Sequence, residues 1–389
     1  MSQKRLAVIG ATGSIGRAAL DVCRRFPEEF DVRALAVRSN IEELKKLVDE
    51  FKPKYVVIYD DVAASKFALH DESVKVLVGH EGLMQLIDEG MDHIVFASSG
   101  TEAIAALSAS LDRKIEVSLA NKESLIVGGP WIMEKASLAD PLRPIDSEHN
   151  AVWQCLLGED LNEIEEIILT ASGGPFLHSS YEEMKLATPS RALKHPTWSM
   201  GSKITVDSAT LLNKGFEVIE ASYLFALPIE KINAVVQPDS LAHGCVRFSD
   251  GSVKMFLSEP DMRIPISFAL SYPKRLKIGH LFHRLAITEK WTLDFLRLDE
   301  NKFPCYSLAR RALQMGNAYP PIIVGADEVA VEAFVEGKIS IVDIFPLLEK
   351  VLLSYNGPSN LNGLEEAISL VEFGRRIARE LCRLFSERR

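Results

Sequence analysis

The first 150 residues alternate short apolar runs with amphipathic stretches, and this alternation constrains the fold more than any other feature of the sequence. Helices are predicted where apolar residues recur at helical spacing, at residues 17–26, 41–51 and 102–111. Strands are predicted at residues 6–9, 32–37, 55–58, 74–78, 93–96 and 115–119. Strands and helices in alternation favour an α/β fold with a doubly wound parallel sheet.

A glycine-rich turn, GATGSIG at residues 10–16, follows the first predicted strand and opens the first predicted helix. Gly10 would permit the tight turn, Gly13 would let the backbone approach a pyrophosphate, and Gly16 would let the helix pack on the sheet. Such a turn alone is also compatible with a bend that binds nothing, but the alternating pattern behind it favours dinucleotide binding. We therefore predict a Rossmann-like nucleotide-binding domain over residues 1–149.

The end of the second predicted strand indicates which dinucleotide is bound. An NAD site usually has Asp or Glu at this place, to bind the ribose hydroxyls. Here residues 37–40 read Val-Arg-Ser-Asn, without an acid. Arg38 can pair with a 2′-phosphate, which favours NADP. The alternative is that Arg38 is a solvated side chain after a strand.

Two carboxylates, Asp146 and Glu148, lie in the segment PIDSEHN at residues 144–150. In an extended chain, their spacing places both side chains on one face, whereas in a helix they would point roughly 200° apart. We expect the extended conformation. Carboxylates on one face repel each other unless a cation or a proton lies between them. Because Glu217 can supply a third carboxylate, the sequence predicts a site for a hard divalent cation. A solvated strand end is the alternative.

The remaining residues predict a catalytic α+β domain at 150–275, a connecting linker at 276–302 and a C-terminal helical bundle at 303–389. Residues 173–200 have little apolar periodicity, and a loop this long inside a compact domain is usually a lid or disordered. We expect this lid to be mobile without ligand. Strands are predicted at residues 166–170 and 232–236, a hairpin at 246–248 and 253–257, and bundle helices at 306–315, 327–336, 341–355 and 364–385.

Several polar residues lie where a substrate could bind. Lys122 follows a predicted strand, and the carboxyl ends of parallel strands border the ligand crevice. Residues 206–210 are expected to open a helix on which Asn213, Lys214 and Glu217 lie within about a turn. Ser208, Asn213 and Lys214 would then bind a phosphate, and Glu217 would reach the metal. The far end of the lid carries His195, Trp198 and Met200.

Composition excludes several classes of protein. The formal net charge of −10 argues against nucleic-acid binding. The five cysteines are scattered without a CxxC pair, which argues against a disulfide framework or a zinc site and fits a reducing cytosol. No apolar run reaches about 18 residues, and a strand is predicted almost at the first residue, without room for a signal peptide. We expect a cytoplasmic protein that is not bound to a membrane.

Six motifs carry a resemblance to a known family: GATGSIG (10–16), LANKES (119–124), PIDSEHNA (144–151), SGGPF (172–176), HPTWSMGSKITVDSATLLNKGFEVIEA (195–221) and EPDMRIPI (259–266). Through these motifs the chain resembles the 1-deoxy-D-xylulose 5-phosphate reductoisomerase family over essentially its full length, least closely in the C-terminal bundle. Departures from the family pattern are few: Ala171 and Gln237 stand where the family usually has Gly and His, and Ser39 occupies a position that is often basic.

The resemblance implies an NADPH- and metal-dependent enzyme whose site residues fall into three groups, with catalytic roles for Lys122, Glu148 and His195. It implies that Mg²⁺ or Mn²⁺ binds to Asp146, Glu148 and Glu217. It implies that NADPH binds to Thr12, Gly13, Ser14, Ile15, Arg38, Asn40, Asn121, Glu123 and Gly201. It implies that the phosphosugar binds to Lys122, Ser147, Glu148, Ser172, His195, Trp198, Met200, Ser208, Asn213, Lys214 and Glu217.

The reaction implied by the resemblance is the rearrangement and reduction of 1-deoxy-D-xylulose 5-phosphate to 2-C-methyl-D-erythritol 4-phosphate, in the non-mevalonate route to isoprenoids. A retro-aldol cleavage and re-addition would precede reduction by NADPH, and Lys122, Glu148 and water are all candidates for the proton acceptor. The resemblance also implies a homodimer. An NADP-dependent semialdehyde dehydrogenase is the alternative enzyme, but it needs a cysteine nucleophile, and no cysteine here lies in a recognisable site. A non-catalytic nucleotide sensor would have no need of three carboxylates and a lid.

Overall fold

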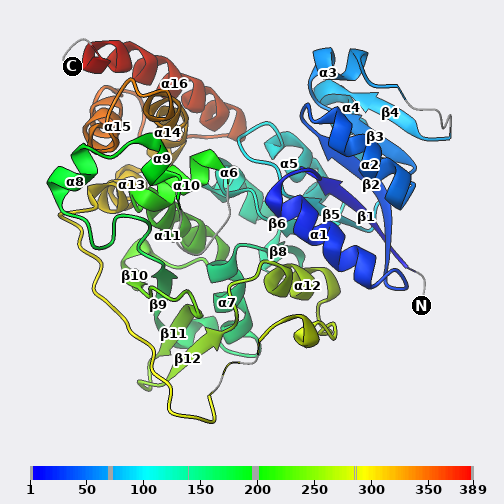
Figure 1. Cartoon of the computed structure of the whole chain (residues 1–389), viewed down its shortest axis with the longest axis horizontal. Helices are drawn as coiled ribbons and strands as arrows, with labels where there is room; N and C mark the ends of the chain where they lie inside the picture. Colours follow the sequence, from blue (N-terminus) through cyan, green and yellow to red (C-terminus); the bar gives the residue numbers. More distant parts are fainter. Residues whose placement is uncertain are drawn as a thin grey trace. The chain divides into compact units, whose positions relative to one another are not determined.

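The structure, a computed structural model, describes residues 3–68, 73–138, 140–194, 201–283, 285 and 287–386, with side chains up to residue 384. The chain forms two compact units, whose elements are labelled in Figure 1. The domain boundaries given above stay predictions, because each unit combines separate stretches of sequence. The first unit contains Met1–Ser124, Ile132–Asn150 and Asp261–Phe282, and the second contains Leu125–Trp131, Ala151–Pro260 and His283–Arg389.

The first unit is built on a parallel sheet, as predicted. Among the described residues this sheet has eight strands in the order β4-β3-β2-β1-β5-β6-β8-β7, and neighbouring strands pair in parallel. The order reverses between β1 and β5, which is where open α/β sheets bind ligands. The strands are β1 (Lys4–Ile9), β2 (Phe30–Val37), β3 (Tyr55–Ile58), β4 (Lys75–Val78), β5 (His93–Phe96), β6 (Glu116–Leu119), β7 (Ser137–Leu138) and β8 (Pro141–Pro144).

Helices cover both faces of this sheet. Right-handed crossovers place the helices that connect β1 to β4 on one face and those that follow β4 and β5 on the other. Consistent with this, α1 packs against α12, and α4 packs against α5. The helices are α1 (Ser14–Arg25), α2 (Ile41–Phe51), α3 (Asp61–Ser65), α4 (Gly79–Ile87), α5 (Ile104–Asp112) and α12 (Arg263–Ser271), while α6 (Lys122–Lys135) and α7 (Ser147–Leu156) each contribute residues to both units.

A polar cluster joins α12 to the sheet. The carboxylate of Glu116 accepts hydrogen bonds from Lys4 Nζ at 2.6 Å and Arg143 Nη2 at 2.5 Å, and it lies 3.1 Å from the buried ring of His93. Lys4 and Arg143 also donate to the backbone carbonyls of Leu270 and Ala269, at 3.1 and 3.0 Å. These bonds give α12, distant in sequence, polar partners in the first unit.

Burial sets the charge state of this cluster. It lowers the pKa of His93 to about 4, so the ring is neutral in the folded protein at neutral pH. Burial alone would raise the pKa of Glu116, but hydrogen bonds from His93 and Lys4 and the charge of Arg143 lower it well below its usual range. The cluster therefore contains an ionised carboxylate beside a neutral imidazole.

We predict that His93 makes the stability of the fold depend on pH between about 6.5 and 4. In this window the unfolded chain binds a proton at His93 and the folded chain does not, so stability falls as the pH falls. The expected loss is about 2 kcal/mol between pH 7.5 and 5. His93→Gln should show a smaller shift of the thermal unfolding midpoint between these pH values, whereas the exposed control His80→Gln should keep the wild-type shift. An unchanged shift in His93→Gln would contradict the prediction.

The second unit contains a mixed sheet with the order β10-β9-β11-β12 among the described residues. β10 and β9 are parallel, and β11 is antiparallel to both β9 and β12. The predicted hairpin is present, although its first strand begins earlier than expected. The strands are β9 (Ile164–Ala171), β10 (Ile232–Val236), β11 (Ala242–Phe248) and β12 (Val253–Leu257).

The helices of the second unit differ from prediction in several places. The described part of the predicted lid contains α8 and α9, whose residues Met184 and Ala192 are buried, so it is not a featureless loop. The helix predicted at residues 327–336 begins earlier, at Tyr319, and Pro320 and Pro321 lie in its first turn, where proline is tolerated. The helices are α8 (Tyr181–Lys185), α9 (Pro189–Ala192), α10 (Ser202–Ala209), α11 (Leu212–Leu224), α13 (Pro304–Met315), α14 (Tyr319–Val335), α15 (Ile344–Leu353) and α16 (Leu364–Ser386), with 3₁₀ turns at Leu161–Glu163, Ile229–Lys231, Gly279–Leu281 and Ile341–Asp343.

None of the helices in the described part of the chain has the length and apolar character needed to cross a membrane.

Candidate active site

The glycine-rich turn after β1 has the geometry predicted for it. Gly10 has a φ of +86°, and a Cβ atom there would lie 2.6 Å from the backbone of Ala97 at the end of β5. A Cβ atom on Gly16 would overlap the carbonyl oxygen of Gly10, so only glycine lets α1 approach the turn this closely. Gly13 is the N-cap of α1 and leaves the first backbone N–H groups of the helix without a side-chain cap. Such N–H groups suit an anion.

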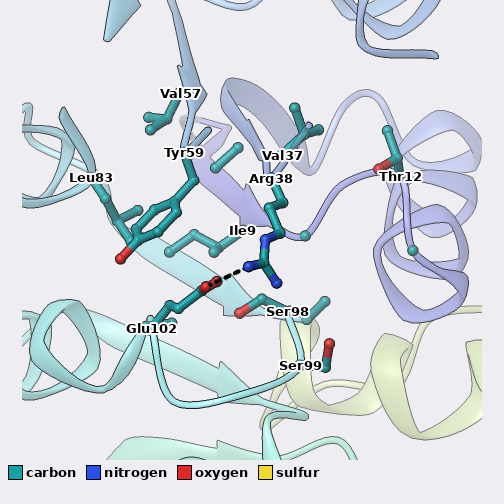
Figure 2. Close-up of a pocket in the computed structure, with 15 residues that line it drawn as sticks. Ile9, Thr12, Val37, Arg38, Val57, Tyr59, Leu83, Ser98, Ser99 and Glu102 are labelled. Atoms are coloured by element: carbon teal, nitrogen blue, oxygen red, sulfur yellow. Dashed lines mark ion pairs between the residues drawn. The ribbon is translucent and has the colours of Figure 1, made fainter. Parts of the chain in front are cut away.

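A pocket of about 200 Å³ opens at the carboxyl ends of β1, β2, β3 and β5 (Figure 2). It includes Thr12 and Gly13 from the turn, and Figure 2 shows Arg38 and Glu102 reaching toward each other across it. Arg38 Nη2 lies 3.1 Å from Glu102 Oε1, and the two side chains are 73% and 37% exposed. Tyr59 also lines the pocket, and burial raises the pKa of its hydroxyl.

The other predicted NADPH residues lie at helix starts. Asn40 caps α2 by accepting a hydrogen bond from the Glu43 N–H at 3.2 Å. Buried Asn121 caps α6 in the same way and donates to the carbonyls of Ser98 and Gly100, at 2.7 and 2.9 Å. The remaining residues are Ser14 and Ile15 in the first turn of α1, Glu123 in the first turn of α6, and Gly201 at the N-cap of α10 in the second unit.

The predicted extended conformation of Asp146 and Glu148 is wrong. β8 ends at Pro144 and α7 begins at Ser147, so Asp146 lies in the bend between them and Glu148 in the first helical turn. The carbonyl of Asp146 accepts the hydrogen bond from the Asn150 N–H at 2.8 Å. The strand therefore ends before either carboxylate, and the two carboxylates do not lie on one strand face.

Within the first unit, Lys122 and the acidic segment come together. The ammonium group of Lys122, the first residue of α6, forms an ion pair with Asp146, and the two side chains are 12% and 17% exposed. Ser147 Oγ donates to Glu148 Oε2 at 2.5 Å. His149 Nδ1 lies 3.7 Å from Asp146 Oδ2. The predicted catalytic residues Lys122 and Glu148 thus lie on two helices whose first turns belong to one polar cluster.

Within the second unit, the glycine loop after β9 lies against the end of α10. Ser172 Oγ accepts a hydrogen bond from the N–H of Gly174 at 3.2 Å. A Cβ atom on Gly174 would lie 2.7 Å from the carbonyl oxygen of Ser208. Ser172, predicted to bind the phosphosugar, and Ser208, predicted to bind its phosphate, thus lie on segments in direct contact. Ser208 lies in the last turn of α10, not at the start of the helix that carries Asn213, as was expected.

The first turns of α11 carry the other predicted residues of the second unit. Leu211, with a φ of +58°, separates α10 from α11. Asn213 Nδ2 donates to Glu217 Oε1 at 2.5 Å, and Lys214 forms an ion pair with Glu217 Oε2. The Lys214 and Glu217 side chains are 3% and 2% exposed, so this pair is shielded from water. The predicted His195, Trp198 and Met200 lie outside the described residues.

Three family profiles match the chain, and together they span most of it. They describe a 1-deoxy-D-xylulose 5-phosphate reductoisomerase domain at residues 6–129, a C-terminal domain of the same enzyme at 142–225 and a further DXP reductoisomerase C-terminal domain at 257–377. A relative of that name from Chlorobaculum tepidum is 42% identical over 97% of this chain and 99% of its own length. A second, from Persephonella marina, is 42% identical over 95% of each chain.

Solved structures agree with these sequence matches. A 1-deoxy-D-xylulose 5-phosphate reductoisomerase from Zymomonas mobilis, in complex with NADPH, is 36% identical with a TM-score of 0.89, over 98% of this chain and 99% of that one. Another DOX-P reductoisomerase, in complex with NADPH, fosmidomycin and magnesium, is 35% identical with a TM-score of 0.89, over 98% of both chains. This chain belongs to the 1-deoxy-D-xylulose 5-phosphate reductoisomerase family. The family and the fold class inferred from sequence motifs are thus confirmed.

Membership in the reductoisomerase family leaves the semialdehyde dehydrogenase alternative unsupported, and the cysteines argue against it independently. All five, at positions 23, 155, 245, 305 and 382, are buried. Burial raises the pKa of Cys23 to about 12 and those of Cys155 and Cys245 to about 11. A nucleophilic cysteine needs a lowered pKa and access to substrate, so these thiols do not suit acyl transfer.

Several residues that line this pocket were not predicted from the sequence: Tyr59, Ser98, Ser99 and Glu102. They follow β3 and β5, and β5 lies beside β1 at the switch point. A general rule could have indicated these residues, because the carboxyl ends of the strands next to β1 border this crevice. Strand order, however, is not visible in the sequence.

We predict that Gly174→Ala destabilises this reductoisomerase more than Gly251→Ala does. Both glycines have positive φ, of +66° and +86°, so both substitutions introduce backbone strain. Only at position 174 would the new methyl group also clash with a backbone carbonyl; at position 251 no atom lies within 4 Å of it. The measurement is the thermal unfolding midpoint of each variant. Equal shifts for the two variants would contradict the close contact between the Gly174 loop and Ser208.

Proposed function

We propose that this chain converts 1-deoxy-D-xylulose 5-phosphate to 2-C-methyl-D-erythritol 4-phosphate with NADPH and a divalent metal ion. The observation that carries the proposal is 42% identity to a reductoisomerase across 97% of the chain, with no large segment left unmatched. Family relatives in solved structures hold NADPH and, in one case, NADPH, fosmidomycin and magnesium together. The chain's own residues support each of these ligands separately.

NADPH is the proposed reductant. The pocket at the switch point of the sheet combines the first turn of α1, whose N–H groups suit a pyrophosphate, with a guanidinium group at the end of β2. The proposed contacts are Thr12, Gly13, Ser14, Ile15, Arg38, Asn40, Asn121, Glu123 and Gly201. In the proposed reaction, Arg38 holds the 2′-phosphate and the helix start holds the pyrophosphate, which leaves the nicotinamide end for the substrate.

Asp146, Glu148 and Glu217 are the residues proposed to hold the metal ion. Their fit rests on the donor set, because carboxylate oxygens are what a hard cation such as Mg²⁺ requires. The ion pairs of Lys122 with Asp146 and of Lys214 with Glu217 also support the fit. They show that the protein stabilises negative charge at these two carboxylates, which are largely shielded from water. When bound, the ion supplies a Lewis acid that polarises the substrate carbonyl. We propose that Mn²⁺ can replace Mg²⁺.

The remaining site residues are proposed to bind and orient the phosphosugar. The hydroxyls of Ser172 and Ser208, the amide of Asn213 and the ammonium of Lys214 would hold the phosphate. Lys122 Nζ, adjacent to Asp146, carries a proton that can be delivered to a substrate oxygen. Lys122, Glu148 and water stay candidates for the proton acceptor. Ser147 would position Glu148 through the hydrogen bond between them.

The proposal also includes residues that lie outside the described part of the chain. His195, Trp198 and Met200 would cover the substrate as the far end of a lid over residues 173–200, and closure would exclude water. His195 would also contribute to catalysis. We further propose a homodimer in the cytoplasm.

The direct test is turnover by the purified chain. With 1-deoxy-D-xylulose 5-phosphate, NADPH and Mg²⁺, we expect a loss of NADPH absorbance and formation of 2-C-methyl-D-erythritol 4-phosphate, identified by NMR. Excess chelator should abolish turnover, and added Mg²⁺ should restore it, because the ion polarises the reacting carbonyl. Full turnover in chelator would contradict the metal requirement, and absence of the product in the presence of Mg²⁺ would contradict the proposed function.

A second prediction tests the cofactor assignment. Arg38→Ala removes a charge-assisted contact with the 2′-phosphate that is worth roughly 1.5–3 kcal/mol. The KM for NADPH should therefore rise about ten-fold or more, and the KM for NADH should change little. Arg33→Ala, which removes a partly exposed arginine of β2 that pairs with Asp31, is the control and should leave both values unchanged. Equal losses for both cofactors would show that Arg38 supports the fold instead.

A further inference from the structure

Glu102 places a carboxylate inside the nucleotide pocket. It lies in the turn between β5 and α5, and its carboxylate reaches Arg38 from the opposite wall, as Figure 2 shows. Among the described residues that line the pocket, these two carry the formal charges. The formal charges on the pocket wall therefore cancel, although Arg38 alone would predict a positively charged site.

Glu102 lies just before a helix, two residues ahead of the first residue of α5. The first turn of α5 holds no acidic residue, and its N-cap, Ala103, offers no side-chain hydrogen bond. The Glu102 carboxylate therefore lies at the point where Arg38 would meet a ligand.

A 2′-phosphate and Glu102 would compete for the same guanidinium group. The contact distance of 3.1 Å means that a dianionic phosphate bound to Arg38 also approaches the Glu102 carboxylate, and like charges at this range repel. The neighbouring Ser39 adds no second positive charge. A ribose 2′-hydroxyl behaves oppositely, because a carboxylate accepts a hydrogen bond from it, as acidic residues do in NAD sites.

We propose that Glu102 determines cofactor specificity: its carboxylate weakens NADPH binding by competing for Arg38 and accepts a hydrogen bond from the ribose 2′-hydroxyl of NADH, so that this chain uses both cofactors. This inference rests on the proposed function, since it concerns the cofactor of that reaction. It adds an acidic residue from the β5–α5 turn to a site whose specificity sequence reasoning assigned to Arg38 alone.

The test compares Glu102→Gln with wild type in steady-state kinetics with each cofactor. Gln keeps the size of the side chain and removes its charge. We expect the KM for NADPH to fall about three- to ten-fold and the KM for NADH to rise about two- to five-fold. The effect on NADPH should shrink as ionic strength increases, because the groups are exposed. Asp88→Asn is the matched control: it breaks a comparably exposed carboxylate–arginine pair, with Arg113, away from the pocket, and should change neither KM.

The outcomes separate three accounts. A rise in the KM for NADPH would overturn the proposal and show that Glu102 instead orients Arg38 for the phosphate. An unchanged ratio of kcat/KM for the two cofactors would overturn it as well. Failure of the proposed function is distinguishable, because wild type would then turn over with neither cofactor.

A binding measurement tests the same inference without turnover and without a variant. The probes are ADP-ribose and its 2′-phosphate, titrated calorimetrically into the wild-type chain. Because Glu102 offsets Arg38, their Kd values should agree within about ten-fold. Tighter binding of the 2′-phosphate by a factor of about a hundred or more would overturn the proposal, whatever reaction the chain catalyses.

Discussion

A carboxylate that is shielded from water needs a positive charge beside it, and both halves of the candidate site meet this need with a lysine. In the first unit Lys122 pairs with Asp146, and in the second Lys214 pairs with Glu217. Each pair neutralises a carboxylate within its own unit. In the proposed function, a divalent ion neutralises the carboxylates in place of the lysines. The ammonium groups of Lys122 and Lys214 then become available to bind the substrate. Metal and phosphosugar binding would then support each other.

The nucleotide pocket depends on a different constraint, which is close approach of backbone. Gly10 permits contact between the first turn and β5, and Gly16 lets α1 lie against the same turn. In the proposed function, the charges of Arg38 and Glu102 then determine which nucleotide this frame binds. Shape and specificity would therefore have separate causes: glycines shape the pocket, and exposed side chains on its rim would select the ligand.

Local patterns predicted the bounds of several elements. β3 and β5 are short strands buried at every position, and α2 buries Leu44, Leu47 and Val48 at helical spacing, so the pattern of apolar residues was enough to place them. The conformation of Asp146 and Glu148 was mispredicted, since the helix starts at Ser147 directly after a short strand and a bend. The pairing of Arg38 with Glu102, and of Lys4 and Arg143 with α12, joins residues far apart in sequence, which no local pattern encodes.

The central claim is that Asp146, Glu148 and Glu217 bind one divalent ion together, and a Mn²⁺ titration tests it most directly. Free Mn²⁺ is measured by electron paramagnetic resonance for wild type and for Asp146→Asn, Glu217→Gln and the exposed control Glu165→Gln, after thermal unfolding confirms that each is folded. The account predicts one ion per chain, with affinity about ten-fold or more weaker in both site variants and unchanged in the control. Wild-type affinity in Glu217→Gln, with a loss in Asp146→Asn, would contradict a shared site.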